Sequence, residues 1–117
     1  MAMVSREPER TAQLNTVLDV LRNPRRRYVL YVFQEADDPV VPFETIVEGV
    51  RKYEPPDGVT AELPPRQSVR IDLVHVHLPK LESAGLLERD ARTGNVRFHG
   101  HSLIEEWAEQ ASEIELE

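Results

Sequence analysis

The chain has 117 residues, of which 40% are hydrophobic, and it carries a net charge of −7 and no cysteine. This length fits one compact domain with a modest core, and the lack of cysteine excludes a disulfide framework and a cysteine-ligated zinc site. The chain lacks a run of about 18 apolar residues, and its polar N-terminus does not resemble a secretory signal. We therefore expect a cytoplasmic protein that makes no membrane contact.

The negative charge is concentrated at one end of the chain. Residues 102–117 contain six glutamates and no lysine or arginine, whereas the whole chain has 12 arginines and only two lysines. An acidic, arginine-rich and lysine-poor composition is typical of salt-loving archaea, where surface charge keeps a protein hydrated. An ordinary acidic bacterial or archaeal protein is the alternative. The sign of the charge argues against indiscriminate phosphate binding.

Asparagine and proline divide the N-terminal half into short elements. Apolar residues recur at helical spacing over 11–22, after a flexible arm at 1–10. Asn23 is a suitable N-cap and Pro24 a favoured first helical residue, so a second helix is expected there. The predicted elements are helices at 11–22, 24–36 and 43–53 and a short extended piece at 40–43. The face of the second helix that we expect to be buried comprises Tyr28, Val29, Val32 and Phe33.

A proline-rich loop and a long helix follow. Four prolines and a glycine identify the loop at 54–65, and the helix spans 67–84. Its apolar positions that we expect to face the core are Ile71, Val74, Leu78 and Leu81. Pro79 lies inside this helix. Either the helix runs through it with a kink, because the bond to the His75 carbonyl is lost, or one helix ends before it and the next begins.

The last two elements are a hairpin at 86–99 and an acidic amphipathic helix at 102–117. Apolar residues alternate on both sides of a glycine-containing turn in the hairpin, while Ser102 and Glu105 form a capping box that starts the final helix. We therefore predict a mainly α fold with a small β-hairpin. The order of elements is that of a winged helix-turn-helix domain, at residues 11–101, with flanking N- and C-terminal helices.

Two segments resemble a known superfamily. "LDVLRNPRRRYVLYVF" resembles the opening of ArsR-like regulators, and "HVHLPKLESAGLLERD" followed by "TGNVRFHG" resembles their recognition helix and wing. The matching positions are His77-Leu78, Leu81 and Ala84-Gly85-Leu86. The combination is similar to a haloarchaeal family of small winged-helix proteins and covers about 40 residues. The resemblance implies a recognition helix at 67–84 in the major groove and a wing at 86–99.

The candidate DNA contacts lie in three places. They are Arg66, Gln67, Ser68, Arg70 and His75 in the recognition helix or just before it, Arg89, Arg92 and Arg97 in the hairpin, and Arg25 and Arg26 in the second helix. Glutamine can pair with adenine, and arginine with guanine or phosphate. Arginines at a wing tip commonly reach the minor groove or the backbone. For the cluster at 25–27, salt bridges with glutamates of the protein are the alternative.

The rest of the exposed face of the recognition helix is poor in hydrogen-bond donors. It is expected to include Asp72, Val76 and Pro79, of which the first is unfavourable beside phosphates and the other two offer only apolar contact. This face is therefore less suited to reading bases than the winged-helix plan would lead one to expect.

We expect no metal, cofactor or catalytic site. His75 and His77 diverge on a helix, whereas His99 and His101 could chelate on a strand, without a cysteine to assist them. We interpret His77 as a partly buried packing residue and His75 as exposed. The chain has no nucleophile elbow and no phosphate-binding glycine loop, which argues against an enzyme. No small-molecule effector is predicted.

The terminal helices are candidates for self-association, because the final helix has little core left to cover its apolar face. Tryptophan is also a common interface anchor. The residues expected at a dimer interface are Leu14, Leu18, Leu103, Trp107, Ala111 and Ile114. Packing within one chain is the alternative.

We predict a DNA-binding transcriptional regulator that binds double-stranded DNA as a homodimer, whose two-fold symmetry suits palindromic sites. The alternative is a winged-helix module for protein-protein interaction that does not bind DNA. The net charge of −7 and the donor-poor helix face favour this alternative.

Overall fold

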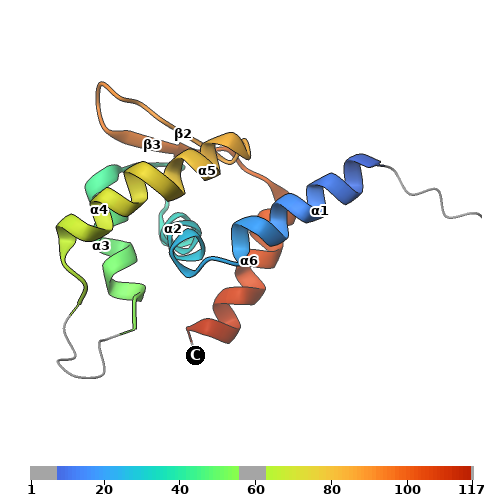
Figure 1. Cartoon of the computed structure of the whole chain (residues 1–117), viewed down its shortest axis with the longest axis horizontal. Helices are drawn as coiled ribbons and strands as arrows, with labels where there is room; N and C mark the ends of the chain where they lie inside the picture. The colour runs from blue at the N-terminus through green and yellow to red at the C-terminus, as the bar shows by residue number, and fades with distance from the viewer. Residues whose placement is uncertain (1–7, 56–62, 117) are drawn as a thin grey trace, which may run out of the picture.

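The chain folds into a group of helices with a small antiparallel sheet along one side (Figure 1). The structure, a computed structural model, describes residues 8–55 and 63–116. Its helical elements are α1 (Pro8–Leu21), α2 (Pro24–Glu35), α3 (Phe43–Tyr53), α4 (Arg66–Asp72), the π-helical turn η1 (Leu73–His77), α5 (Leu78–Ser83) and α6 (Ser102–Glu115). Its strands are β1 (Val40–Pro42), β2 (Leu87–Arg89) and β3 (Asn95–Phe98). The predicted combination of helices with a small hairpin is confirmed.

None of the helices in the described part of the chain has the length and apolar character needed to cross a bilayer.

The sheet joins the hairpin to the strand that precedes α3. Its order is β1-β3-β2, and both strand pairs are antiparallel. Leu87 lies opposite Phe98 and Arg89 opposite Val96, which confirms the predicted hairpin. β1 is an edge strand, as Pro42 led us to expect, because proline cannot donate a hydrogen bond to a second neighbour.

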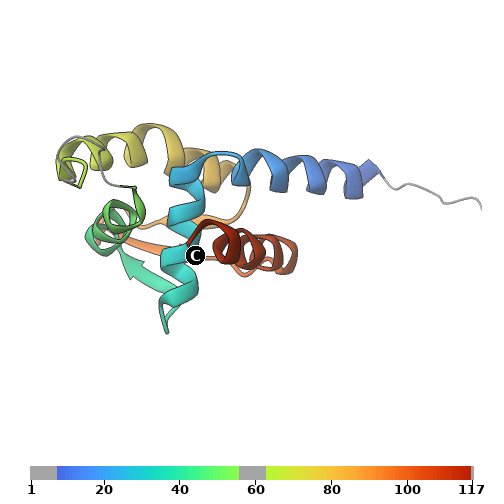
Figure 2. The same ribbon diagram turned by 90° about the horizontal axis from the view of Figure 1, so that it is seen from below.

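α2 lies at the centre of the fold, and the other helices pack around it (Figures 1 and 2). Asn23 caps it by accepting a hydrogen bond from the Arg25 N–H at 2.9 Å, and Pro24 follows at the first helical position, as predicted. Every residue over 28–33 is buried, so the predicted face is confirmed and the opposite side is enclosed as well. A helix that is apolar on all sides is typical of a core position.

Two arginines in the first turn of α2 hold the C-terminal end of α1. Arg26 is 5% exposed, and its Nε and Nη2 donate to the carbonyls of Val20 and Asp19 at 3.0 and 2.7 Å. Arg27 donates to the Leu21 carbonyl. The last carbonyls of a helix have no partner within that helix, so these guanidinium groups satisfy them.

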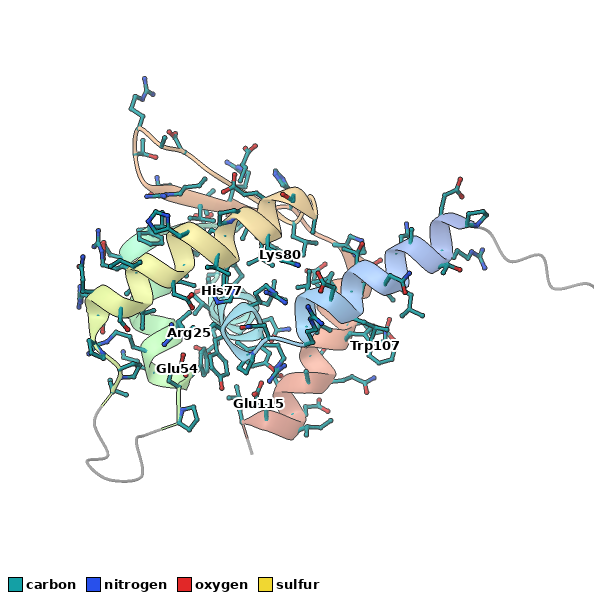
Figure 3. The ribbon with its side chains drawn as sticks, in the orientation of Figure 1. Arg25, Glu54, His77, Lys80, Trp107 and Glu115 are labelled. Atoms are coloured by element: carbon teal, nitrogen blue, oxygen red, sulfur yellow. The ribbon has the colours of Figure 1, made fainter. Side chains whose placement is uncertain are left out.

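The same turn of α2 also fastens the end of α6. The carboxylate of Glu115 accepts hydrogen bonds from Arg27 Nε and Nη2 at 2.8 and 2.7 Å and from the Tyr31 hydroxyl at 2.9 Å (Figure 3). These bonds lower the pKa of the Glu115 carboxyl, with Arg27 as the main cause. The C-terminal helix is therefore attached to the centre of the fold at its far end.

Residues 66–83 form one helix that runs through Pro79 with a single π-helical turn. The Leu78 N–H donates to the Leu73 carbonyl, five residues earlier. In a regular α-helix the proline would lack its hydrogen bond and its ring would clash with the carbonyl of His75. The wider turn accommodates the ring, so the first of the two alternatives for Pro79 is the one observed.

This π-helical turn changes which side chains face the core. Val69 is fully buried before it, Leu73 at its first position, and Leu78 and Leu81 after it. Ile71 is 51% exposed, so the prediction that it faces the core was wrong. The prediction counted regular α-helical spacing from Leu78 back to Ile71, across the π-helical turn. A π-helical turn holds one extra residue, which rotates the preceding positions by about 100° relative to that period.

Two predicted boundaries also change. Residues 8–10 belong to α1 rather than to the flexible arm, because proline and glutamate suit the first turn of a helix. His101 caps α6, one residue before the predicted Ser102, and its Nδ1 accepts the Ile104 N–H at 3.2 Å. The remainder of the predicted arm and residues 56–62 of the predicted loop lie outside the described part of the chain.

Removal of the Glu115 carboxylate tests the attachment of α6. We expect Glu115→Ala to lower the free energy of unfolding by about 2 kcal/mol, because a half-buried arginine and a tyrosine lose a charged partner. The exposed neighbour Glu113 supplies the control, and Glu113→Ala should change the same quantity by less than about 0.5 kcal/mol. Urea unfolding followed by circular dichroism measures both variants. Equal effects would contradict the role assigned to Glu115.

Candidate nucleic-acid interface

One side of the helix at 66–83 faces away from the rest of the protein. Arg70 pairs with Glu44 of α3 on one flank, and Lys80 pairs with Asp19 of α1 at 3.0 Å on the other. Between these flanks lie four exposed residues, Gln67, Ile71, His75 and Pro79, which we call the outer stripe. Gln67 and Ile71 share a face before the π-helical turn, His75 lies within that turn, and Pro79 follows it.

Glutamates of α3 neutralise two arginines that were expected to contact DNA. Arg66 pairs with Glu48, and Arg70 pairs with Glu44. A hydrogen bond from Arg51 lowers the pKa of the Glu48 carboxyl, and the charge of Arg66 adds to this effect. Both pairs are exposed, so each contributes about 1 kcal/mol or less and leaves the arginine free to exchange partners. The outer stripe itself contains no lysine or arginine.

The hairpin carries arginines that are not neutralised in this way. Within the described residues, no carboxylate forms an ion pair with Arg89, Arg92 or Arg97. Arg92 lies in the turn, which Asp90 shapes by accepting the Arg92 N–H at 2.9 Å. Arg89 and Arg97 line an open groove of about 460 Å³ together with Asn95. Glu88 and Asp90 line the same groove, and the strand register places Arg97 opposite Glu88 and Arg89 opposite Val96. The hairpin therefore carries arginines on both of its faces, close to two carboxylates that form no ion pair with them.

Phe43, at the start of α3, connects this hairpin to the helix. The guanidinium carbon of Arg89 lies 4.8 Å from the centre of the Phe43 ring, and that of Arg70 lies 5.8 Å from it. Both distances are within the range of cation–π contacts. Sequence reasoning missed Phe43, because its contacts join three segments that are distant in sequence. The ring holds an arginine from each element at a common junction.

Arg25 lies in a network of ion pairs inside the fold (Figure 3). Its Nε donates to Glu54 Oε1, and its Nη1 donates to Asp72 Oδ2 at 2.9 Å. The same Asp72 oxygen lies 2.8 Å from His77 Nε2. The network links the start of α2, the end of α3 and the π-helical turn.

Arg25 and Arg26, which were expected to contact DNA, bind groups of the protein itself in the structure. Arg25 is occupied by two carboxylates, and Arg26 is buried against the end of α1. The salt-bridge alternative foreseen for this cluster describes Arg25 and Arg27, while Arg26 binds backbone carbonyls instead. The remaining candidates lie on the outer stripe, on its flanks or on the hairpin.

The histidines do not form a metal site within the described part of the chain, where no group of three ligating side chains occurs. His75 is exposed, as interpreted from the sequence, and His77 is buried. Because Asp72 accepts at Nε2, the neutral ring of His77 leaves its Nδ1 as a buried acceptor without a partner among the described residues. Burial lowers the pKa of His77 despite the opposing charge of Asp72.

The residues expected at a dimer interface fall into two groups. Exposed on α1 and α6 are Leu14, Leu18, Trp107 and Ile114. Leu103 and Ala111 pack partly against the core of their own chain. Ile104 and Ala108 are the fully buried positions of α6, so the apolar side chains of this helix divide between the core and the surface.

A protein-family model described as a domain of unknown function, DUF7344, matches residues 18–97. The match begins within α1 and ends within β3, so it includes the helix at 66–83 and most of the hairpin. No curated protein and no solved structure matches the chain.

The buried His77 should make stability depend on pH. Its folded-state pKa is lower than the ordinary value of 6.5, so below that value the unfolded chain binds a proton that the folded chain does not. The free energy of unfolding should therefore fall as the pH drops below about 6.5, by up to about 1.4 kcal/mol per pH unit. His77→Gln should weaken this dependence, whereas His75→Gln should retain it. Urea unfolding at pH 7.5 and 5.5 measures the change in the free energy of unfolding for the wild type and both variants. The same change with pH in all three proteins would contradict the role assigned to His77.

Proposed function

The chain belongs to the DUF7344 family, and we propose that it is a winged helix-turn-helix protein that binds double-stranded DNA as a transcriptional regulator. In this proposal the helix at 66–83 is the recognition helix, and the β2–β3 hairpin is the wing. The order of elements and the pairing of β1 with the hairpin support it, since both suit the winged-helix plan.

One observation carries the DNA-binding proposal. Arg89, Arg92 and Arg97 project from one hairpin without a carboxylate partner among the described residues, and Phe43 joins that hairpin to the recognition helix. In an acidic protein, unpaired arginines beside an exposed helix face are groups available to phosphates. Their position on the wing fits contacts with the backbone or the minor groove.

A protein-interaction module without DNA binding is the second candidate. The pairing of Arg66 and Arg70 with glutamates of α3 favours it, because those pairs remove positive charge from the recognition helix. In this alternative the apolar part of the outer stripe would contact a protein. The net charge of −7 points the same way.

We further propose that the regulator is a homodimer formed through α1 and α6. These helices contact each other, and both extend to the same side of the molecule (Figure 2). Trp107 is 45% exposed and Ile114 is 79% exposed on α6, while Leu14 and Leu18 are exposed on α1. A second copy would cover these side chains, and a large aromatic residue is a common anchor of such interfaces.

The wing arginine at the turn provides the test of DNA binding. We expect Arg92→Ala to weaken binding to genomic DNA fragments about equally across sequences, and to reduce the slope of log K against log salt by about one, because one phosphate contact is lost. Arg22→Ala, an exposed change in the turn between α1 and α2, is the control. Fluorescence anisotropy over a salt series measures both. Absence of wild-type binding, or binding untouched by Arg92→Ala, would favour the protein-interaction candidate.

The homodimer has its own test at Trp107. Trp107→Glu places a charge at the centre of the proposed interface, so we expect the molar mass measured by light scattering to fall from that of two chains to that of one. Glu106→Gln, at the exposed neighbouring position, should leave the mass unchanged. A wild-type protein with the mass of a single chain would contradict the dimer.

A further inference from the structure

We propose that the outer stripe selects A·T base pairs in the major groove, with the side chain of Ile71 packed against thymine methyl groups. The inference rests on the proposed DNA binding and names the class of sequence that the recognition helix reads. It assigns a specificity-determining role to a residue that the hydrophobic pattern of the sequence placed in the core.

The chemistry of the stripe leads to this choice. Ile71 is 51% exposed and lies between Gln67 and His75 on the outward face of the helix. In the major groove, the apolar group that a base pair offers is the C5 methyl of thymine, and a glutamine side chain can pair with both N6 and N7 of adenine. Two consecutive positions of the stripe are thus complementary to the two bases of A·T pairs.

The stripe lacks the side chain that most often reads guanine. That contact is usually a bidentate arginine, and the arginines of α4 lie on a flank instead. Arg66 and Arg70 turn toward Glu48 and Glu44 of α3. In the structure these two arginines therefore point toward α3, and an apolar side chain holds the outward position between Gln67 and His75.

The π-helical turn explains why Ile71 occupies this face. With regular α-helical spacing before Leu78, Ile71 would lie on the buried side, whereas the extra residue in the turn places Val69 and Leu73 there. Pro79 requires the wider turn, and it also lies on the stripe. Pro79 thus contributes to the outward position of Ile71, because it requires the π-helical turn.

DNA is the occupant that the surrounding charge favours. The wing carries Arg89, Arg92 and Arg97, which form no ion pair with a carboxylate among the described residues. Glu88 and Asp90 lie on the same hairpin, so its arginines outnumber its carboxylates by three to two, which favours a polyanion. Phe43 connects the flank of the recognition helix to this wing, because Arg70 and Arg89 both contact its ring.

Replacement of thymine by uracil isolates the methyl group. A duplex would first be selected from a random-sequence library with the full-length wild-type protein, then synthesised with thymine or with uracil in the bound positions. At one fixed salt concentration, we expect wild-type affinity to fall roughly fourfold for each contacted methyl group that is removed. Ile71→Ala should bind the two duplexes equally and should match the wild-type affinity for the uracil duplex.

Val76 provides a comparison, because it is 48% exposed and also β-branched but lies within the π-helical turn rather than beside Gln67 in α4. Val76→Ala should keep the full preference for the thymine duplex. Circular dichroism of both variants confirms that they fold.

The possible results of this experiment distinguish failure of the proposed DNA binding from failure of the role assigned to Ile71. If no duplex is enriched, the proposed DNA binding fails, and the inference fails with it. If a duplex binds with equal affinity in its thymine and uracil forms, or if Ile71→Ala retains the preference, the inference is overturned while DNA binding stands. Loss of the preference in Ile71→Ala alone supports the assigned role.

Discussion

The first turn of α2 holds the fold together, because three consecutive arginines there reach three sides of the central helix. Successive residues of an α-helix point about 100° apart, so Arg25, Arg26 and Arg27 meet different neighbours. Arg25 contacts the ends of α3 and α4, Arg26 the end of α1, and Arg27 the end of α6. Positive charge is unfavourable at a helix N-terminus. The carbonyls and carboxylates that surround these side chains offset that cost.

The pairing of arginines with carboxylates also determines the charge of the proposed interface. α3 supplies glutamates to Arg66 and Arg70, whereas the wing arginines have no such partner among the described residues. Under the proposed function, the wing would provide attraction to phosphates, and the recognition helix would provide discrimination with few charges. Binding of this kind relies less on counterion release and more on base contacts and apolar burial.

The π-helical turn links the core to that interface. It places His77 in the core beside Asp72, which also pairs with Arg25 at the start of α2. It also sets the outward direction of Ile71. Turns of this type occur frequently at functional sites, where one extra residue re-aims the side chains around it. Here a single proline has consequences for both packing and surface chemistry.

The sequence by itself determined the elements and most of their boundaries, because caps, breakers and hydrophobic period act over a few residues. Asn23 with Pro24, the apolar face of α3 and the alternation in the hairpin are signals of this kind. It also identified the arginines of the wing as candidates for DNA contact. Only the tertiary structure decided which arginines form ion pairs with carboxylates of the protein. Arg25 pairs with Asp72, which lies 47 positions along the chain, and local sequence pattern carries no information over that separation. The orientation of Ile71 was likewise decided there, because the π-helical turn interrupts the regular period on which sequence reasoning depends.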